Sequence, residues 1–250
     1  MNGFEKHNLK HTSPSQINMW EESPAAWGAS YLYGHKFSFG VAAQIGVLTE
    51  QVVAAVLSER ESFSNAVEQA EKTFTKNNAL NTSQKDLGRI GDIAVMAEQA
   101  IEVLKPYGKP DFPLDGQHKI EIMCKGDGWQ LPVIGYIDFY YPDQGLIVDL
   151  KTTLRMPSTM TGAHLRQGAI YQAAMGNKAV KFLYVTPKKT QVFDIENGAD
   201  HLAEIKGILN RQEKMLRAFS HEELKQVLPL NLGSFYWNGA EHTRKELYGI

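Results

Sequence analysis

Two charged residues stand inside one of the most apolar stretches of the chain, the sequence LIVDLK at residues 146–151. The stretch before it, VIGYIDFYY at residues 133–141, is rich in β-branched and aromatic residues, which favour strands. The turn-forming sequence PDQG separates the two stretches. Together they predict two strands joined as a hairpin, with charges carried in a region that should be largely buried.

Asp149 and Lys151 lie two residues apart, so on a strand their side chains project from the same face, while Leu150 points the other way into the core. Burial of charge is costly unless the charge is paired or binds a metal. The predicted hairpin also brings Asp138 close to Asp149, and a divalent cation would remove the repulsion between the two carboxylates. A plain Asp–Lys ion pair on a sheet face explains the strand pattern equally well.

The residue types around this strand suit phosphodiester hydrolysis. A metal held by Asp138 and Asp149 can bind a scissile phosphate, lower the pKa of a bound water and stabilise transition-state charge. Lys151 would then lie beside the attacking water or a phosphate oxygen. Gln167 and Tyr171, four residues apart, share one face of a predicted helix, where they can hold a phosphate or orient the lysine. Taken alone, that face is more typical of a solvated helix surface.

The remaining pattern predicts an α/β fold with a mixed central sheet flanked by helices and a mostly helical N-terminal part. Helical spacing of apolar residues occurs at 40–57, 62–77, 88–105, 161–175 and 199–219, and strands are expected at 120–123, 180–185 and 190–195. Ser13 and Pro14 provide a helix start. We therefore expect a flexible N-terminus over 1–12 and a single domain over 13–250, helical over 13–110 and α/β over 111–250.

Composition narrows the classes of function. The formal net charge is −2 for 250 residues, so any nucleic-acid contact must come from a local basic groove. The single cysteine, Cys124, excludes a disulfide framework and an iron–sulfur cluster held by several cysteines. The polar first residues and the lack of an apolar run of bilayer length predict a cytoplasmic protein.

Five segments together resemble the PD-(D/E)XK nuclease superfamily and, within it, the RecB-like exonuclease group. The sequence GYID ending at Asp138 resembles the first acidic motif, and VDLKTT around Asp149 resembles the (D/E)-x-K-T motif. The sequence QGAIY, residues 167–171, resembles the Q-x-x-x-Y helix. The opening residues 13–17 and the Ser-Pro pair at 23–24 resemble the N-terminal signature of that group, with serine in place of the usual cysteine. The sequence GVLTE places Glu50 where an upstream helix supplies one more ligand, most often a histidine in that group.

The resemblance implies a restriction-endonuclease-like core that hydrolyses DNA phosphodiesters from strand ends, with Mg²⁺ or Mn²⁺ and without an iron–sulfur cluster. The catalytic residues that it implies are Asp138, Asp149, Lys151, Gln167 and Tyr171. The implied metal ligands are Glu50, Asp138, Asp149 and the backbone carbonyl of Leu150. The implied DNA contacts are Ser13, Ser15, Arg166, Gln167 and Tyr171.

Compact members of this group are common among phage recombination exonucleases, which suggests a role in DNA recombination or repair, with a single-strand annealing or binding protein as a partner. A positive rim is expected from Lys151, Arg155, Arg166, Lys178, Lys181, Lys188 and Lys189. The aromatic residues Trp20, Trp27, Tyr31 and Tyr33 either stack bases or belong to the core. Three alternatives remain: an endonuclease of the same fold, a non-catalytic DNA-binding protein, and a metal enzyme acting on a small phosphate ester.

Overall fold

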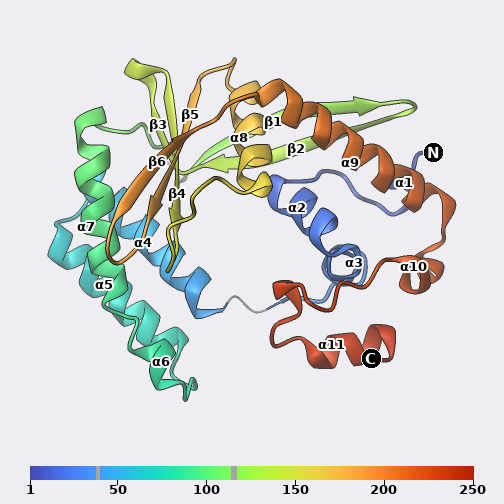
Figure 1. Cartoon of the computed structure of the whole chain (residues 1–250), viewed down its shortest axis with the longest axis horizontal. Helices are drawn as coiled ribbons and strands as arrows, with labels where there is room; N and C mark the ends of the chain where they lie inside the picture. Colours follow the sequence, from blue (N-terminus) through green and yellow to red (C-terminus); the bar gives the residue numbers. More distant parts are fainter. Residues whose placement is uncertain (38–39, 114–116) are drawn as a thin grey trace.

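The computed structural model describes residues 1–37, 40–113 and 117–250 and contains a mixed central sheet with the strand order β3-β4-β5-β6. These strands are β3 (Phe139–Tyr141), β4 (Leu146–Thr152), β5 (Ala179–Val185) and β6 (Thr190–Asp194). Strands β4 and β5 are parallel, and helix α8 (Gly162–Ala174) makes the crossover between them; the other two pairings are antiparallel. A separate antiparallel ribbon is formed by β1 (His118–Gly126) and β2 (Trp129–Ile137) and extends away from the sheet (Figure 1).

Helices make up most of the remainder, and the α/β class predicted from the sequence is confirmed. They are α1 (Gly3–Lys6), α2 (Pro14–Glu22), α3 (Pro24–Tyr31), α4 (Val41–Leu57), α5 (Phe63–Asn77), α6 (Gln84–Leu87), α7 (Asp92–Leu104), α9 (Gly198–Ala218), α10 (His221–Val227) and α11 (Glu241–Tyr248), with short 3₁₀ turns η1 (Lys105–Tyr107), η2 (Pro142–Gln144) and η3 (Phe235–Trp237). Within the described ranges, no helix is both long and apolar enough to cross a bilayer.

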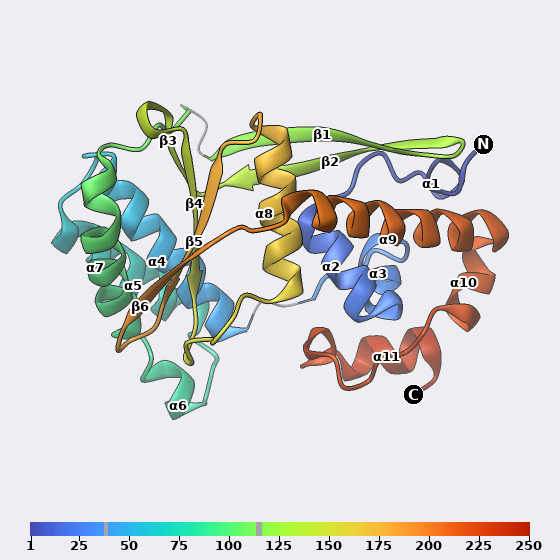
Figure 2. The ribbon, with the colours of Figure 1, turned by 45° about the horizontal axis from the view of Figure 1, so that its top comes forward.

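Alternation along β4 divides the apolar interior into two cores. Leu146, Val148 and Leu150 pack with α4, α5 and α7 on one face of the sheet. Ile147 faces the opposite core, which α8, α9, α2 and the β1–β2 ribbon complete. Figure 2 shows α4, α5 and α7 on one side of the sheet and α8 on the other. Because side chains alternate, Asp149 and Lys151 share the face of Ile147, and Leu150 is buried in the other core, as predicted.

The strand predicted over 133–141 is in fact two strands that belong to different sheets. β2 pairs with β1, whereas β3 pairs with β4, and Asp138 lies at the break between them. The β-branched and aromatic residues on both sides of Asp138 favour extended backbone, so the stretch reads as one continuous strand although aspartate itself is uncommon in strands. The Oδ2 atom of Asp138 accepts a hydrogen bond from the backbone N–H of Leu150 (2.9 Å), which replaces the strand pairing at this point.

The first residues also differ from the flexible N-terminus expected over 1–12. Residues 3–6 form α1, with Asn2 as its N-cap in a capping box, and the Phe4 side chain is buried in the α9 core. A Cβ atom on Gly3 would lie 2.4 Å from the carbonyl oxygen of Glu213, so only glycine permits this close approach to α9. The backbone of Thr12 then pairs with β2.

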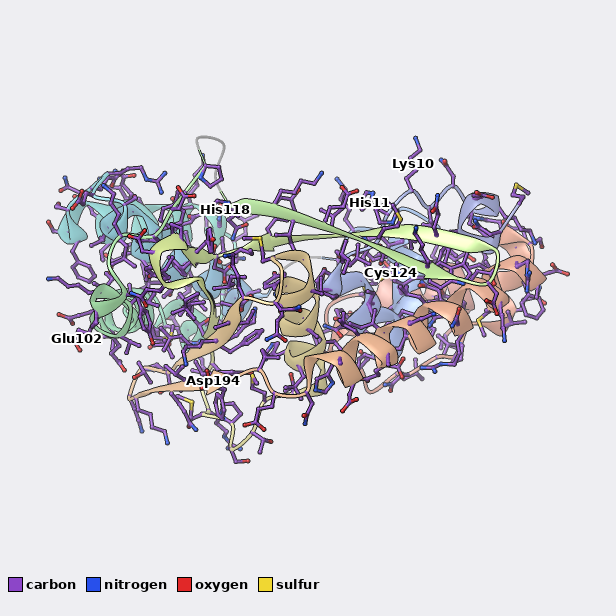
Figure 3. The ribbon with its side chains drawn as sticks, turned by 90° about the horizontal axis from the view of Figure 1, so that it is seen from above. Lys10, His11, Glu102, His118, Cys124 and Asp194 are labelled. Carbon is purple, nitrogen blue, oxygen red and sulfur yellow. The ribbon has the colours of Figure 1, made fainter. Side chains whose placement is uncertain are left out.

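Figure 3, seen from above, shows His11 beside the β1–β2 ribbon, with His118 at the start of β1 and Cys124 farther along it. Cys124 is half-buried, and burial raises the pKa of its thiol, so this cysteine is a structural strand residue.

The C-terminal segment returns to the N-terminal helices. The Tyr248 hydroxyl donates to the carbonyl oxygen of Ala25 (2.8 Å), and the Trp237 ring packs edge-on against Phe37. Figure 1 shows this red segment beside α3. The chain thus ties its two ends together through aromatic packing rather than through cysteines.

Candidate active site

Asp138 stands at the junction of the β1–β2 ribbon and the central sheet, and the register of the next pair, Phe139 with Val148, places it beside Asp149. Asp138 directly precedes β3 and Asp149 lies in the neighbouring β4, so the hairpin brings the two acids together. The hydrogen bond from Leu150 to Oδ2 fixes the orientation of the Asp138 carboxylate. Its other oxygen, Oδ1, accepts a hydrogen bond from Gln117.

Asp149 is fully buried at 0% exposure, and two side chains hold its carboxylate. Oδ1 forms an ion pair with the Lys151 ammonium, and Oδ2 accepts a hydrogen bond from Nε2 of Gln167 (2.9 Å). The ammonium also lies 5.5 Å from the centroid of the Phe182 ring. The Asp–Lys ion pair considered from the strand pattern is therefore present, but it lies beside two further carboxylates and not on an open sheet face.

The Gln167–Tyr171 face of α8 is directed inward, toward these acids. Nε2 of Gln167 lies 2.8 Å from the Tyr171 hydroxyl, which in turn donates to the carbonyl oxygen of Tyr136 (2.6 Å). A Cβ atom on Gly135 would lie 2.8 Å from the Tyr171 ring, so the glycine of the GYID sequence lets the tyrosine pack on β2. This chain of hydrogen bonds connects α8, β4 and β2 across the site.

Glu50 reaches the cluster from α4, and Gln117 joins it to Asp138. Nε2 of Gln117 donates to Oε1 of Glu50 (2.6 Å) and to Oδ1 of Asp138 (3.0 Å). Helix α4 comes close to β4 at Gly46, where a Cβ atom would lie 2.9 Å from Oγ1 of Thr152. Gln117 was not predicted, because it precedes β1 in a segment without a periodic pattern or a motif.

The pKa values of all three carboxyl groups are raised, chiefly by burial. Burial, followed by the charge of Asp149, raises the pKa of Glu50 to about 7. Burial and the charges of Asp149 and Glu50 raise the pKa of Asp138. Burial also raises the pKa of Asp149, although Lys151 opposes the shift. Burial disfavours the Lys151 ammonium, but the surrounding carboxylates outweigh this effect and raise its pKa.

The chemistry of the donor set fits a divalent cation. Glu50, Asp138 and Asp149 supply the oxygen ligands that Mg²⁺ and Mn²⁺ prefer, and a cation would relieve their mutual repulsion. In the part of the chain that the structure describes, no three His, Cys, Asp or Glu side chains are arranged to hold a metal as they stand. Other side chains engage the acidic oxygens instead: Gln117 donates to Glu50 and Asp138, and Lys151 pairs with Asp149.

Asp138 and Lys151 line a groove of about 1110 Å³ between α2, α8 and the β1–β2 ribbon. The residues predicted to contact DNA all line it: Ser13, Ser15, Arg166, Gln167 and Tyr171. Of the predicted positive rim, Lys151 and Arg166 line this groove, and Lys119, which was not predicted, joins them. Arg166 is held by Glu204 (2.6 Å) and Asn18 (2.8 Å). A second hollow of about 650 Å³ shares Asp138, Glu50 and Gln117 with the cluster and opens beside α4 and α5.

The aromatic residues that were predicted either to stack bases or to belong to the core do not line this groove. Trp20 and Trp27 are buried against each other, with ring centroids 4.9 Å apart, and belong to the core. Tyr33 donates a hydrogen bond to the carbonyl oxygen of His221 outside the groove. The aromatic side chains that do line the groove with the acids are Tyr136, Tyr171, Phe235 and Tyr236.

Comparison with known proteins identifies a matching family. A family model described as the PD-(D/E)XK nuclease superfamily matches residues 11–235. No curated protein matches the chain. Among solved structures, the one titled "Crystal structure of SSO0001" is 13% identical with a TM-score of 0.37, covering 82% of this chain and 90% of that one. The complex of Scheffersomyces stipitis Rai1 with (3'-NADP)+ and calcium ion is 10% identical with a TM-score of 0.32, covering 92% and 72%.

Proposed function

The chain belongs to the PD-(D/E)XK nuclease superfamily, and we propose that it is a metal-dependent DNA exonuclease of the RecB-like kind that hydrolyses phosphodiester bonds from DNA ends during recombination, repair or DNA processing. The observation that carries the proposal is a cluster of three carboxylates with Lys151, of which Asp138 and Lys151 line the large groove, Glu50 lines the adjoining hollow and Asp149 is buried beneath Lys151. The inward face of α8, with Gln167 and Tyr171, supports the RecB-like assignment.

Each residue has a role that its contacts suit. Glu50, Asp138 and Asp149 would hold Mg²⁺ or Mn²⁺, together with the predicted Leu150 carbonyl. When bound, such a cation polarises the scissile phosphate and makes a bound water a better nucleophile. Lys151, fixed by Asp149, donates to a phosphate oxygen or to the attacking water. Gln167 holds the second oxygen of Asp149 and so keeps the acid–lysine pair in one orientation.

The test is digestion of matched DNA substrates in Mg²⁺ and in Mn²⁺. An exonuclease releases nucleotides from linear DNA and spares a covalently closed circle, whereas an endonuclease of the same fold cuts both. Asp149→Asn, purified in parallel, controls for a contaminating nuclease because it is close to isosteric. If the wild type cuts no substrate with either metal, or if Asp149→Asn cuts equally well, the nuclease proposal is wrong.

The close approach of α4 to β4 leads to a prediction about the placement of Glu50. Gly46→Ala should lower cleavage about ten-fold, because its Cβ meets Oγ1 of Thr152 and displaces the helix turn that precedes Glu50, and small misplacements of catalytic groups are costly. The double variant with Thr152→Ala removes the clashing oxygen and should recover most of the activity.

Steady-state kinetics on linear DNA, with the folded state checked by circular dichroism, measures the Gly46 effect. Gly40→Ala is the matched control, since a Cβ atom at this N-cap of the same helix meets nothing within 4 Å. If Gly46→Ala is fully active, the close approach of α4 to β4 does not set the position of the Glu50 carboxylate.

A further inference from the structure

An aromatic pair, one ring exposed and the other half-buried, lines the same groove as Asp138. The Phe235 side chain is 64% exposed, and its ring lies 4.1 Å from that of Tyr236, with an angle of 32° between the planes. Both residues line the groove that also contains Asp138 and Lys151. A single exposed apolar side chain is common on protein surfaces, but this one stands beside a second ring in the groove that contains the catalytic candidates Asp138 and Lys151.

The pair is held in place by its neighbours. Trp237, the next residue, is buried against Phe37. The side-chain oxygen of Ser234 accepts the backbone N–H of Tyr236. The Asn231 side-chain amide donates to the carbonyl oxygen of Glu22 at the end of α2 (3.0 Å). The rings are therefore presented by an anchored turn, and little side-chain freedom would be lost on binding a flat ligand.

Helix α2 leads from the acids to this pair. Ser15, Asn18 and Glu22 line the groove and are spaced three and four residues apart, so they share one helix face. From Ser15 to Glu22 that face runs roughly 10 Å, given the rise per residue of a helix. The aromatic pair is thus one wall of the path that leads to the reacting centre, displaced from it along α2.

The charged residues differ between the two ends of the groove, and Arg166, which also lines it, is paired with Glu204 (2.6 Å). Lys119 and Lys151 lie on the side of the acids, where a phosphate would be held. At the aromatic end the charged groups of α2 are Glu21, which pairs with Arg211 (3.3 Å), and Glu22, which has no cationic partner among the described ion pairs. An unbalanced carboxylate repels a phosphate, but it can accept a hydrogen bond from the amino group of a base.

We propose that Phe235 and Tyr236 form a stacking platform for an unpaired base of the DNA strand that enters the groove; this inference rests on the proposed function. Stacking on an aromatic ring tolerates every base, as a nuclease without sequence preference requires. In an intact duplex the faces of internal bases are covered by their neighbours, so the platform selects a single-stranded segment next to the scissile phosphate. The proposal therefore gives the exonuclease a preference for single-stranded ends.

The test is a scan with an abasic residue. Single-stranded oligonucleotides, each lacking one base at a different distance from the end, are bound to the protein in EDTA and their affinities measured by fluorescence anisotropy. The wild type should bind roughly 5- to 100-fold more weakly when the abasic residue falls at one particular position, which is the range for stacking one base on an aromatic side chain. In Phe235→Ala this penalty should nearly disappear, so that the abasic and intact oligonucleotides bind about equally well. Phe235→Trp should retain the penalty.

Leu232→Ala is the matched control, because Leu232 is also an exposed apolar residue of this segment but does not line the groove. A wild type with no position-dependent penalty, or no DNA binding, overturns the platform, as does a penalty that persists in Phe235→Ala. Cleavage in Mg²⁺ is measured separately. If the protein cuts DNA but shows no abasic penalty, the proposed function stands and the stacking platform is wrong. If it shows the penalty but never cuts DNA, the nuclease assignment is wrong.

Discussion

Asp138→Asn should lower DNA cleavage by about three orders of magnitude and, at the same time, make the metal-free protein more stable. The loss of activity follows from removing one anionic ligand from the proposed metal site, where a cation contributes several kcal/mol of charge stabilisation. The gain in stability follows from the crowding of carboxylates, because asparagine keeps an oxygen that can accept the Leu150 N–H but carries no charge.

The sign of the stability change comes from the raised pKa of Asp138. The folded protein binds a proton on this carboxyl more readily than the unfolded chain does, so its contribution to stability is present at acid pH and is lost as pH rises through the folded-state pKa. At pH 8, well above the pKa of the unfolded carboxyl, the wild type bears the cost of this raised pKa and the asparagine variant does not. For a chain of this size, each 1 kcal/mol gained in the free energy of unfolding should raise the Tm of the variant by about 2–4 °C.

Thermal unfolding in EDTA at pH 8 and pH 5 measures this difference, which should be larger at the higher pH. Asp143→Asn is the matched control, since Asp143 is exposed in the η2 turn between β3 and β4, and it should change neither stability nor cleavage. A variant that melts below the wild type at pH 8, or one that still cuts DNA, would contradict the placement of Asp138 in a crowded acidic site.

Lys151→Met should lose activity to a similar extent but change stability in the opposite direction, by roughly 3 kcal/mol of destabilisation. Asp149 is fully buried, and Lys151 is its cationic partner, so the substitution leaves a buried carboxylate without a counter-charge. The carboxylates raise the pKa of Lys151, so the stability that it contributes is fully present at neutral pH and is lost only as pH rises through that pKa. Methionine retains most of the side-chain volume beside Phe182.

Urea unfolding midpoints in EDTA, together with cleavage rates, give both readouts for Lys151→Met. The loss of stability should shrink toward acid pH, where Asp149, whose pKa is raised, takes up a proton and no longer needs a partner. Lys181→Met is the control: Lys181 pairs with Asp194, whose side chain is largely exposed, and such a surface pair contributes little. Equal stability of Lys151→Met and the wild type would show that the Asp149–Lys151 pair does not hold the buried acid.

The sequence predicted the parts of the site that depend on simple periodicity. Because side chains alternate along a strand, the six residues 146–151 were enough to predict that Asp149 and Lys151 share one face and that Leu150 is buried on the other. The spacing of Gln167 and Tyr171 likewise placed both on one side of a helix. What periodicity left open was whether that side faced solvent or the acids, which depends on how the helix packs between two sheets.

Tertiary contacts decided the remaining features. The break at Asp138 depends on a hydrogen bond from Leu150, twelve residues away, and the low strand preference of a single aspartate does not specify that partner. Phe4 is ordered because Gly3 lets the chain approach α9, more than 200 residues later in the sequence. Burial of Trp20 and Trp27, and exposure of Phe235, likewise depend on how the C-terminal segment returns to α2 and α3, since aromatic content alone does not distinguish core from surface.

The strand break at Asp138 has a mechanical consequence. Between β2 and β3 the ribbon and the central sheet are joined by this single residue, and the ribbon is braced by its contacts with α2, α8 and α9. That bracing fixes the backbone torsions of the residue whose carboxylate faces Glu50 and Asp149. Loosening the packing beneath the ribbon would therefore misalign the acidic cluster even though no acid had been replaced.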